Sequence, residues 1–392
     1  MSDCKSFYGI GEEFFSERVC AYTSEEIARQ PRLWDALGEL LLERKNDAVG
    51  FMERLGGLAR MRIVFTGAGS SAFIGDALSV LLAKNTNLKT ESIHSTDIVS
   101  APESYLFADA PTLLVSFARS GNSPESAGAV EYARAVVKDL YELAIVCDGE
   151  SMLAGVTAES PKSLTFVMPE GSNDNGFAMT GSVTGMMLAG FALFNLDKLD
   201  DIIMDISLLS KNMASSSLGF TETARKWAEK DFARVVYLGS GFLKHLAHEA
   251  SLKMMELTNG VANGAYESAA GFRHGPKSVI NDKTLTVHLI SNSPFTAKYD
   301  IDLLNEIASE QKGNKVIVIC TEDAGNVPGD ETIMIASGDY SVCGDICTGL
   351  QSLVFCQMLA MFKSLSLGIT TDNPSPTGEV NRVVKGVTVY AY

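Results

Sequence analysis

Three charged side chains fall on one face of a predicted helix. Glu249, Lys253 and Glu256 are spaced at i, i+4 and i+7, so a helix through residues 249–256 aligns them. A carboxylate held in place beside an ammonium group can act as a general base. The same spacing is also typical of a solvated ion pair on a helix surface, and the motif alone leaves both interpretations open.

A candidate proton carrier lies about 18 residues beyond Glu256. His274 is flanked by turn-forming residues in the sequence GFRHGP. An imidazole with a pKa of about 6.5 is suited to moving protons near neutral pH, although a loop histidine can also be simply exposed. The triplet His245, His248 and Glu249 differs from the HExxH zinc motif, so we expect no metal ion there.

Serine- and glycine-rich loops form a second group of candidates. Residues 67–71 read GAGSS after an apolar run, residues 116–126 read SFARSGNSPES before a helix, and residues 178–182 read AMTGS. Backbone amides at a helix start, together with hydroxyls, can bind a phosphate without a large positive charge. Ser123 could alternatively serve only as the N-cap of its helix. The candidate phosphate-binding residues are Gly69, Ser70, Ser71, Arg119, Ser120, Gly121, Ser123 and Thr180.

These loops do not carry a nucleotide-binding signature. Phe73 and Ile74 follow the first loop, so the spacing is not GxGxxG, and no Gly-Lys-Ser/Thr is present there. We therefore expect a phosphorylated small molecule as ligand and no cofactor.

The elements that must position these residues are repeated. The run RIVFTGAGS at residues 62–70 has a counterpart, RVVYLGSGF, at residues 234–242, and a second match at nearly the same offset joins residues 143–148 to 316–321. Short β-branched runs alternate with helical patterns in both copies. This alternation predicts an α/β fold with two tandem, doubly wound parallel sheets.

The predicted layout has three parts. Residues 1–48 form a helical N-terminal arm with helix starts near Ser24 and Pro31, residues 49–205 the first domain, and residues 215–392 the second domain with its C-terminal tail. We expect a linking helix from residue 197 to about 221. Strands are predicted at 63–66, 89–93, 112–116, 143–146 and 164–167, and at 235–238, 285–290, 316–319 and 332–335, with helices at 72–84 and 125–138. Ligands of such sheets bind beyond the carboxyl ends of the strands.

Composition excludes several classes of protein. The net charge of −16 repels nucleic acid and anionic membranes. The N-terminus shows no signal peptide, and the apolar stretch from Val183 to Leu196 is too short to span a bilayer, so it reads as a buried helix. The seven cysteines form no CxxC pair and suggest reduced thiols. We expect a cytoplasmic protein that binds neither nucleic acid nor membrane.

Together these motifs resemble the sugar isomerase (SIS) domain family, which binds phosphosugars. Ser120-Gly121-Asn122-Ser123 stands where the family reads Ser-Gly-Glu-Thr, with Asn122 in place of Glu and Arg119 at a usual Gln position. The resemblance covers nearly the whole chain. It extends to the isomerase half of glucosamine-6-phosphate synthase, whose glutaminase half has no counterpart here.

The resemblance implies roles for four residues. Glu249, Glu256 and His274 match the catalytic helix and ring-opening loop of the family, and Asn381–Val389 matches a C-terminal signature that places Lys385 at a functional lysine. The chain is most similar to a stand-alone group of galactosamine-6-phosphate deaminases and tagatose-6-phosphate ketose/aldose isomerases. In the family a neighbouring chain contributes the histidine loop, which implies a homodimer or a higher homo-oligomer with shared sites.

The implied reaction is a deaminating isomerisation of an amino-hexose 6-phosphate. His274 opens the sugar ring, Glu256 moves a proton from C2 to C1, and Lys385 or backbone amides stabilise charge on O1. Two alternatives stay open: a plain aldose–ketose isomerase of hexose 6-phosphates, and a phosphosugar sensor that has lost catalysis.

Overall fold

The computed structural model describes residues 6–7, 9–86, 88–384 and 386–392. The chain forms two compact units, each assembled from segments that are distant in sequence. Unit 1 comprises Met1–Pro31, Asn175–Thr180 and Met204–Thr377, and unit 2 comprises Arg32–Asp174, Gly181–Ile203 and Gly378–Tyr392.

Unit 2 is built on a five-stranded parallel sheet in the order β4-β3-β5-β6-β7. The strands are β3 (Arg62–Thr66), β4 (Thr90–Ser92), β5 (Thr112–Ala118), β6 (Leu140–Val146) and β7 (Ser163–Val167). Every residue of β5 and β6 is buried, as expected for central strands that are covered on both faces. The strand order reverses between β3 and β5, so the loops after these two strands diverge and flank the usual ligand position of the fold.

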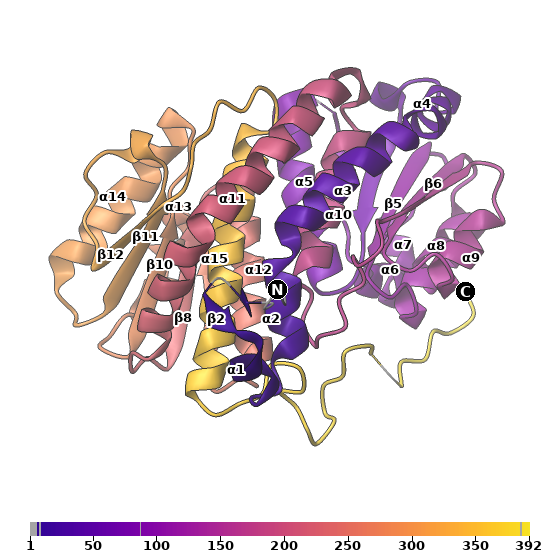
Figure 1. The fold of residues 1–392 in the computed structure, drawn as a ribbon. Coiled ribbons are helices and arrows are strands. Elements are labelled where there is room, and N and C mark those ends of the chain that lie inside the picture. Colours follow the sequence, from indigo (N-terminus) through magenta and orange to yellow (C-terminus); the bar gives the residue numbers. More distant parts are fainter. Residues whose placement is uncertain (1–5, 8, 87, 385) are drawn as a thin grey trace, which may run out of the picture. The chain divides into compact units, whose positions relative to one another are not determined.

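Helices cover both faces of this sheet (Figure 1). Helices α5 (Ser70–Thr86) and α10 (Gly181–Leu193) pack together on one face, and α6 (Ser95–Ser100), α8 (Pro124–Val136) and α9 (Met152–Ala158) lie on the other. All 13 residues of α10 are buried, which confirms the buried apolar helix expected from the sequence. Helices α4 (Lys45–Arg54) and α7 (Pro102–Tyr105) complete the unit, together with most of α3 (Gln30–Glu43).

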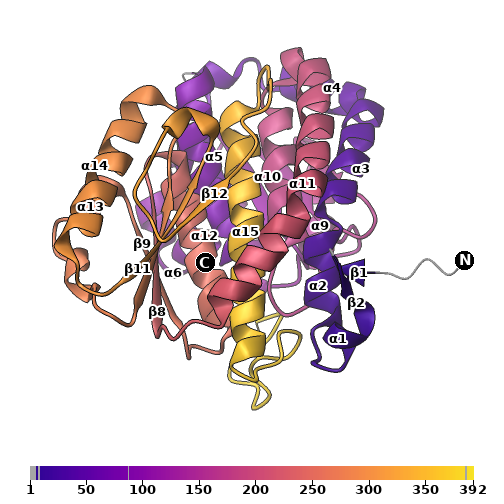
Figure 2. The same ribbon diagram turned by 60° about the vertical axis from the view of Figure 1, so that its left-hand side comes forward.

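Unit 1 repeats the same topology, with the order β9-β8-β10-β11-β12. Its strands are β8 (Arg234–Gly239), β9 (Asn263–Glu267), β10 (Thr284–Leu289), β11 (Lys315–Cys320) and β12 (Glu331–Met334). Helices α12 (Phe242–Leu257) and α15 (Gly344–Ser366) lie on one side, and α13 (Ala269–Phe272) and α14 (Pro294–Glu310) on the other (Figure 2). The unit also holds the hairpin β1 (Ser6–Phe7) and β2 (Ile10–Gly11), helices α1 (Glu12–Ser16) and α2 (Ala21–Ala28), and most of α11 (Leu199–Ala228). The expected pair of parallel α/β sheets is confirmed.

The duplication extends to the loop after each central strand. Residues 122–124 and 292–294 both read Asn-Ser-Pro, and each proline is the first residue of the next helix, α8 or α14. In unit 1 this loop is tied to a carboxylate of its own unit. Asp300 of α14 accepts the Ser240 hydroxyl at 2.5 Å and the Ser291 amide at 3.1 Å. The loops after β8 and β10 are thereby joined through one side chain.

Some expectations differ from the structure. Strand β9 was not expected, because its sequence NGAYE is neither apolar nor alternating and the strand lies at a sheet edge. Helix α2 begins at Ala21 rather than near Ser24, and α11 extends to Ala228 rather than to about 221. The units also cut across the expected limits at 48, 205 and 215, since the arm up to Pro31 packs with unit 1 and the tail Gly378–Tyr392 packs with unit 2.

Within the described residues, one helix is long and apolar enough to cross a membrane. This helix is α15, and 94% of its most apolar stretch is buried inside the protein. Helix α15 packs along α12 and is a core helix of unit 1.

We predict that Gly264→Ala destabilises unit 1. A Cβ atom at Gly264 of β9 would stand 2.1 Å from the Ser251 carbonyl oxygen of α12, so strand and helix must separate. Overpacking of this kind costs about 1–3 kcal/mol, and Tm should fall by about 2–4 °C per kcal/mol in a domain of this size. Scanning calorimetry measures the shift. The control Gly219→Ala in α11 meets no atom within 4 Å and should not lower Tm. Equal Tm values for both variants would contradict the close approach of β9 to α12.

Candidate active site

The three charged residues of α12 form a connected array. The Lys253 ammonium lies 3.3 Å from Glu249 Oε1 and 2.5 Å from Glu256 Oε2. The side chains of Lys253 and Glu249 are 0% and 1% exposed, whereas that of Glu256 is 25% exposed. The solvated ion pair on a helix surface is therefore not what the structure contains. Glu256 is the member of the array that a ligand can reach.

Lys253 stays charged in this environment. Burial disfavours its ammonium form, but the two neighbouring carboxylates outweigh the burial, so the pKa of Lys253 lies above its usual value. A permanently charged lysine fixes the orientation of both carboxylates. Glu256 is thus presented at the rim of the array in one geometry, which is what a general base requires.

Edge strand β9 holds α12 in position. Lys244 of α12 forms an ion pair with Glu267 at 2.8 Å, and the His248 ring stacks on Tyr266 with the ring centroids 3.8 Å apart. Sequence reasoning missed this strand and therefore the use of His248 as a packing side chain. Among the described residues, no cluster of three or more His, Cys, Asp or Glu side chains is arranged to hold a metal ion.

His274 is exposed on the turn that follows α13. Its amide donates to the Gly271 carbonyl at 2.9 Å, and the next residue, Gly275, has a φ of +118° that favours glycine. Arg273 donates to Glu306 of α14 at 2.7 Å, and Lys277 also pairs with that carboxylate. The turn is therefore fixed to α14 on both sides of His274, while the imidazole is presented outward.

In unit 2 the first serine-rich loop is shaped by two glycines. A Cβ at Gly67 would stand 2.7 Å from the Ser71 backbone, and Gly69 has a φ of +56°. Ser70 is the first residue of α5, and Ser70 and Ser71 are both buried. The loop after β3 therefore ends at a helix N-terminus, which favours an anion.

The second loop is braced by the start of α9. Gly121 has a φ of +62° and leaves no room for a side chain, since a Cβ would stand 2.3 Å from Ser151 Oγ. The Gly121 carbonyl accepts the Leu153 amide at 3.0 Å, and Asn122 Oδ1 accepts the Met152 amide at 3.0 Å. Asn122, which departs from the family pattern, thus has a structural role here.

Ser123 precedes α8 at the N-cap position, but its side chain makes no capping hydrogen bond. The capping alternative is therefore not how the Ser123 hydroxyl is used in the structure. Ser120 accepts the Asn122 amide at a long 3.4 Å. Both residues are only partly buried, so a ligand can reach them. Their assignment to phosphate binding stays a prediction.

Arg119 contacts the C-terminal tail. Its buried guanidinium donates to the Arg382 carbonyl at 2.6 Å, and Arg382 in turn donates to the Asp174 carbonyl at 3.0 Å and to Asn173 Oδ1 at 3.1 Å. The sequence did not reveal this link between the second loop and the tail. Lys385, the expected functional lysine, lies outside the described residues.

The third loop is divided between the units. Thr180 is fully buried and belongs to the segment Asn175–Thr180 of unit 1, where its carbonyl accepts the Gln357 side chain at 3.3 Å. Ser182 belongs to unit 2, where its hydroxyl donates to Asp174 at 2.6 Å. The assignment of Thr180 to phosphate binding stays a prediction.

Sequence reasoning gave no role to Glu125. It is the second residue of α8, directly after the second loop, and is 6% exposed. Its Oε2 atom is buried and has no hydrogen-bond partner among the described residues. A buried carboxylate oxygen is costly unless something bonds to it, so Glu125 is a candidate ligand contact.

Comparison with known proteins identifies the family. The SIS domain model matches residues 59–196 and 230–361, so the chain belongs to the SIS domain family. It is 38% identical to D-galactosamine-6-phosphate deaminase AgaS of Shewanella sp. (strain ANA-3), over 98% of this chain and 95% of that protein. Its full-length relatives are named as enzymes, and the chain is an SIS-family enzyme.

Two crystal structures share the fold over nearly the whole chain. A tagatose-6-phosphate ketose/aldose isomerase from Escherichia coli is 33% identical with a TM-score of 0.85, covering 95% of this chain and 96% of its own. A protein from Clostridium novyi NT, provisionally given the same name, is 41% identical with a TM-score of 0.93, covering 99% and 100%. The expected family and fold are confirmed.

We predict that Lys253→Met destabilises the protein by about 3–5 kcal/mol, because it leaves Glu249 as a buried charge without its cation. Adding Glu249→Gln should restore part of the loss. Urea unfolding measures both. Lys138→Met is the control, because it breaks the exposed pair with Asp109 and should not change the midpoint measurably. A loss as small as that of Lys138→Met would show that Glu249 does not depend on Lys253.

Proposed function

We propose that the protein converts galactosamine 6-phosphate to tagatose 6-phosphate and ammonia. The observation that carries the proposal is the Glu249–Lys253–Glu256 array, with Glu256 held by a buried cation and still accessible. The serine-rich loops of unit 2 supply the phosphate site. Similarity over nearly the whole chain to proteins named as galactosamine-6-phosphate deaminases supports this substrate.

The reaction needs two proton movements. His274 transfers a proton between the C1 hydroxyl and the ring oxygen, which gives the open aldehyde. Glu256 then removes the C2 proton, an enolamine forms, and the same carboxylate returns the proton to C1. The product carries a hydroxymethyl group at C1 and an imine at C2. Water adds to the imine, ammonia leaves, and the ketose 6-phosphate remains.

Removal of the C2 proton places negative charge on O1, and this charge requires a hydrogen-bond donor. Lys385 or backbone amides fill that role in the proposal. The proposal also includes a cytoplasmic homodimer in which His274 serves Glu256 of the partner subunit. Such an arrangement agrees with the outward presentation of His274 on its braced turn.

We favour an amino sugar over its 2-hydroxy analogue as the substrate. The full-length relatives that are named as galactosamine-6-phosphate deaminases support this choice. Glu125, whose buried Oε2 atom lacks a hydrogen-bond partner among the described residues, is a candidate ligand contact beside the second loop. The deaminase is therefore the function that we favour.

Ammonia release from galactosamine 6-phosphate tests the proposal directly, with glucosamine 6-phosphate as the comparison substrate. Isomerisation of tagatose 6-phosphate, which contains no nitrogen, tests the plain aldose–ketose alternative. We predict that Glu256→Gln lowers kcat by about 10²–10⁴-fold and leaves phosphosugar binding intact, because only the general base is lost. Glu222→Gln on the exposed face of α11 is the control and should be as active as the wild type. Turnover by Glu256→Gln near the wild-type level would remove Glu256 from this role.

We predict that Ser120→Ala and Ser123→Ala raise KM by more than they lower kcat, since both hydroxyls are assigned to the 6-phosphate. Each lost hydrogen bond to a charged group should weaken binding by about 1.5–3 kcal/mol. Steady-state kinetics with phosphorylated and unphosphorylated galactosamine measure the effect. The unphosphorylated sugar should be a very poor substrate. Equal efficiency on both sugars would mean that the loop does not bind phosphate.

A further inference from the structure

The end of the tail packs on α8 through a close backbone approach. Val389 packs against the apolar cluster of unit 2 that α6, α8 and α9 form with the sheet. Its Cγ1 lies 2.8 Å from the position that a Cβ at residue 128 would occupy. Gly128 of α8 is therefore the reason that the tail can lie this close to the helix.

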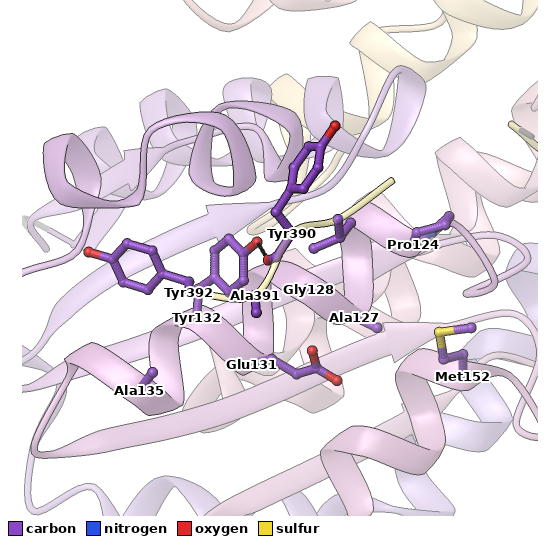
Figure 3. Close-up of a pocket in the computed structure, with 11 residues that line it drawn as sticks. Pro124, Ala127, Gly128, Glu131, Tyr132, Ala135, Met152, Tyr390, Ala391 and Tyr392 are labelled. Carbon is purple, nitrogen blue, oxygen red and sulfur yellow. Dashed lines mark hydrogen bonds between the residues drawn. The ribbon is translucent and has the colours of Figure 1, made fainter. Parts of the chain in front are cut away.

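Tyr132, one turn further along α8, makes two more contacts with the tail. Its hydroxyl donates to the Tyr390 carbonyl, and its ring centroid lies 5.2 Å from that of Tyr392. Figure 3 shows the Tyr132 ring between these two residues, with its hydroxyl directed at the backbone of Tyr390. The Tyr132 side chain is itself buried, so its hydroxyl has a defined position.

Helix and tail together border a pocket of about 540 Å³. The pocket extends along α8 from its first residue, which directly follows Ser123 of the second loop. It is lined by Pro124, Ala127, Gly128, Glu131, Tyr132, Ala135, Met152 and Val389–Tyr392 (Figure 3). The tail thus lies along the helix whose N-terminus borders the proposed phosphate site.

The tail has a second anchor before position 385. Arg119, at the start of the second loop, holds the Arg382 carbonyl at 2.6 Å. Lys385 is three residues after Arg382 and four residues before Val389 in the sequence. Both anchors belong to the loop and helix that carry the proposed phosphate site. The two anchors, at Arg382 and at Val389–Tyr392, thus lie on either side of the expected lysine in the sequence.

We propose that α8 is the docking element of the C-terminal tail, and that Gly128 and Tyr132 are positioning residues that act through Lys385. This inference rests on the proposed function, which gives Lys385 the donor role at O1. The inference adds Gly128 and Tyr132, which do not contact the substrate but determine the fraction of molecules in which the Lys385 donor is in position.

The test compares two double variants of matched chemistry. Tyr132→Phe with Gly128→Ala removes the hydroxyl and fills the space below Val389. Tyr141→Phe with Gly155→Ala makes the same changes in unit 2 away from the tail, because the Tyr141 hydroxyl donates to the Arg54 carbonyl at 3.0 Å and a Cβ at Gly155 meets nothing within 4 Å. Alanine in place of a helical glycine favours the helix, so neither variant is expected to unfold.

The first readout measures docking without substrate. Chymotrypsin cleaves after tyrosine, and the bond after Tyr390 carries the carbonyl that Tyr132 holds. Cleavage tracks the population of the released tail. We expect cleavage after Tyr390, followed by mass spectrometry, to accelerate about threefold to tenfold for the loss of the hydroxyl bond, and further with alanine at position 128. The control double variant should be cleaved at the wild-type rate.

The second readout measures positioning through Lys385. In the wild-type background, the Tyr132/Gly128 double variant should lower kcat on the order of tenfold and change KM by less than about twofold. In a Lys385→Ala background the same two substitutions should lower kcat by less than about twofold, because the donor is already lost. A purely structural defect would lower kcat equally in both backgrounds.

The outcomes separate the two proposals. The positioning role is supported if the tail is released faster and the loss of kcat is absent in the Lys385→Ala background. An unchanged cleavage rate would overturn the docking of the tail on α8. If the tail is released faster but kcat is unchanged, or if kcat falls equally in both backgrounds, the positioning role is overturned. The proposed deaminase function stands in each of these cases. If the wild type releases no ammonia from any amino-hexose 6-phosphate, the deaminase proposal fails and the positioning role fails with it. The cleavage assay still decides whether α8 holds the tail.

Discussion

The buried ammonium of Lys253 is the constraint on which unit 1 depends. It has two carboxylates within 3.3 Å, and in this position it requires them. Helix α12 must therefore be held rigidly, and the edge strand β9 does this through an ion pair, a ring stack and a glycine contact. Because the buried Lys253 charge needs both carboxylates in place, the contacts between β9 and α12 matter for this array.

Unit 2 meets a different requirement with the same topology. Its two loops flank the point where strand order reverses, and glycines with positive φ shape both. Arg119 in the second loop is not solvated, because its guanidinium donates a hydrogen bond to the Arg382 carbonyl of the tail. The second loop thus borders both the proposed phosphate site and the tail that carries the expected lysine.

Local sequence patterns predicted most of this fold, since parallel strands are continuous apolar runs that end in glycine turns. The same patterns aligned Glu249, Lys253 and Glu256 on one helix face. Strand β9 escaped notice because it is short, polar and at an edge. The contacts of Arg119 and Tyr132 with the tail Gly378–Tyr392 join residues more than 250 positions apart. No local periodicity encodes such pairs, so only the folded structure reveals them.

The Asn-Ser-Pro loop of unit 1 carries its own anion. Asp300 accepts hydrogen bonds from the Ser240 hydroxyl and the Ser291 amide, which belong to the loops after β8 and β10. A tethered carboxylate has an effective concentration that a dissolved phosphate in a cell does not reach. The equivalent loops of the two units therefore differ, because in unit 1 a carboxylate of the same unit occupies the hydrogen-bond donors of the loop. In unit 1, the position that corresponds to the proposed phosphate site therefore already holds a carboxylate of the chain itself.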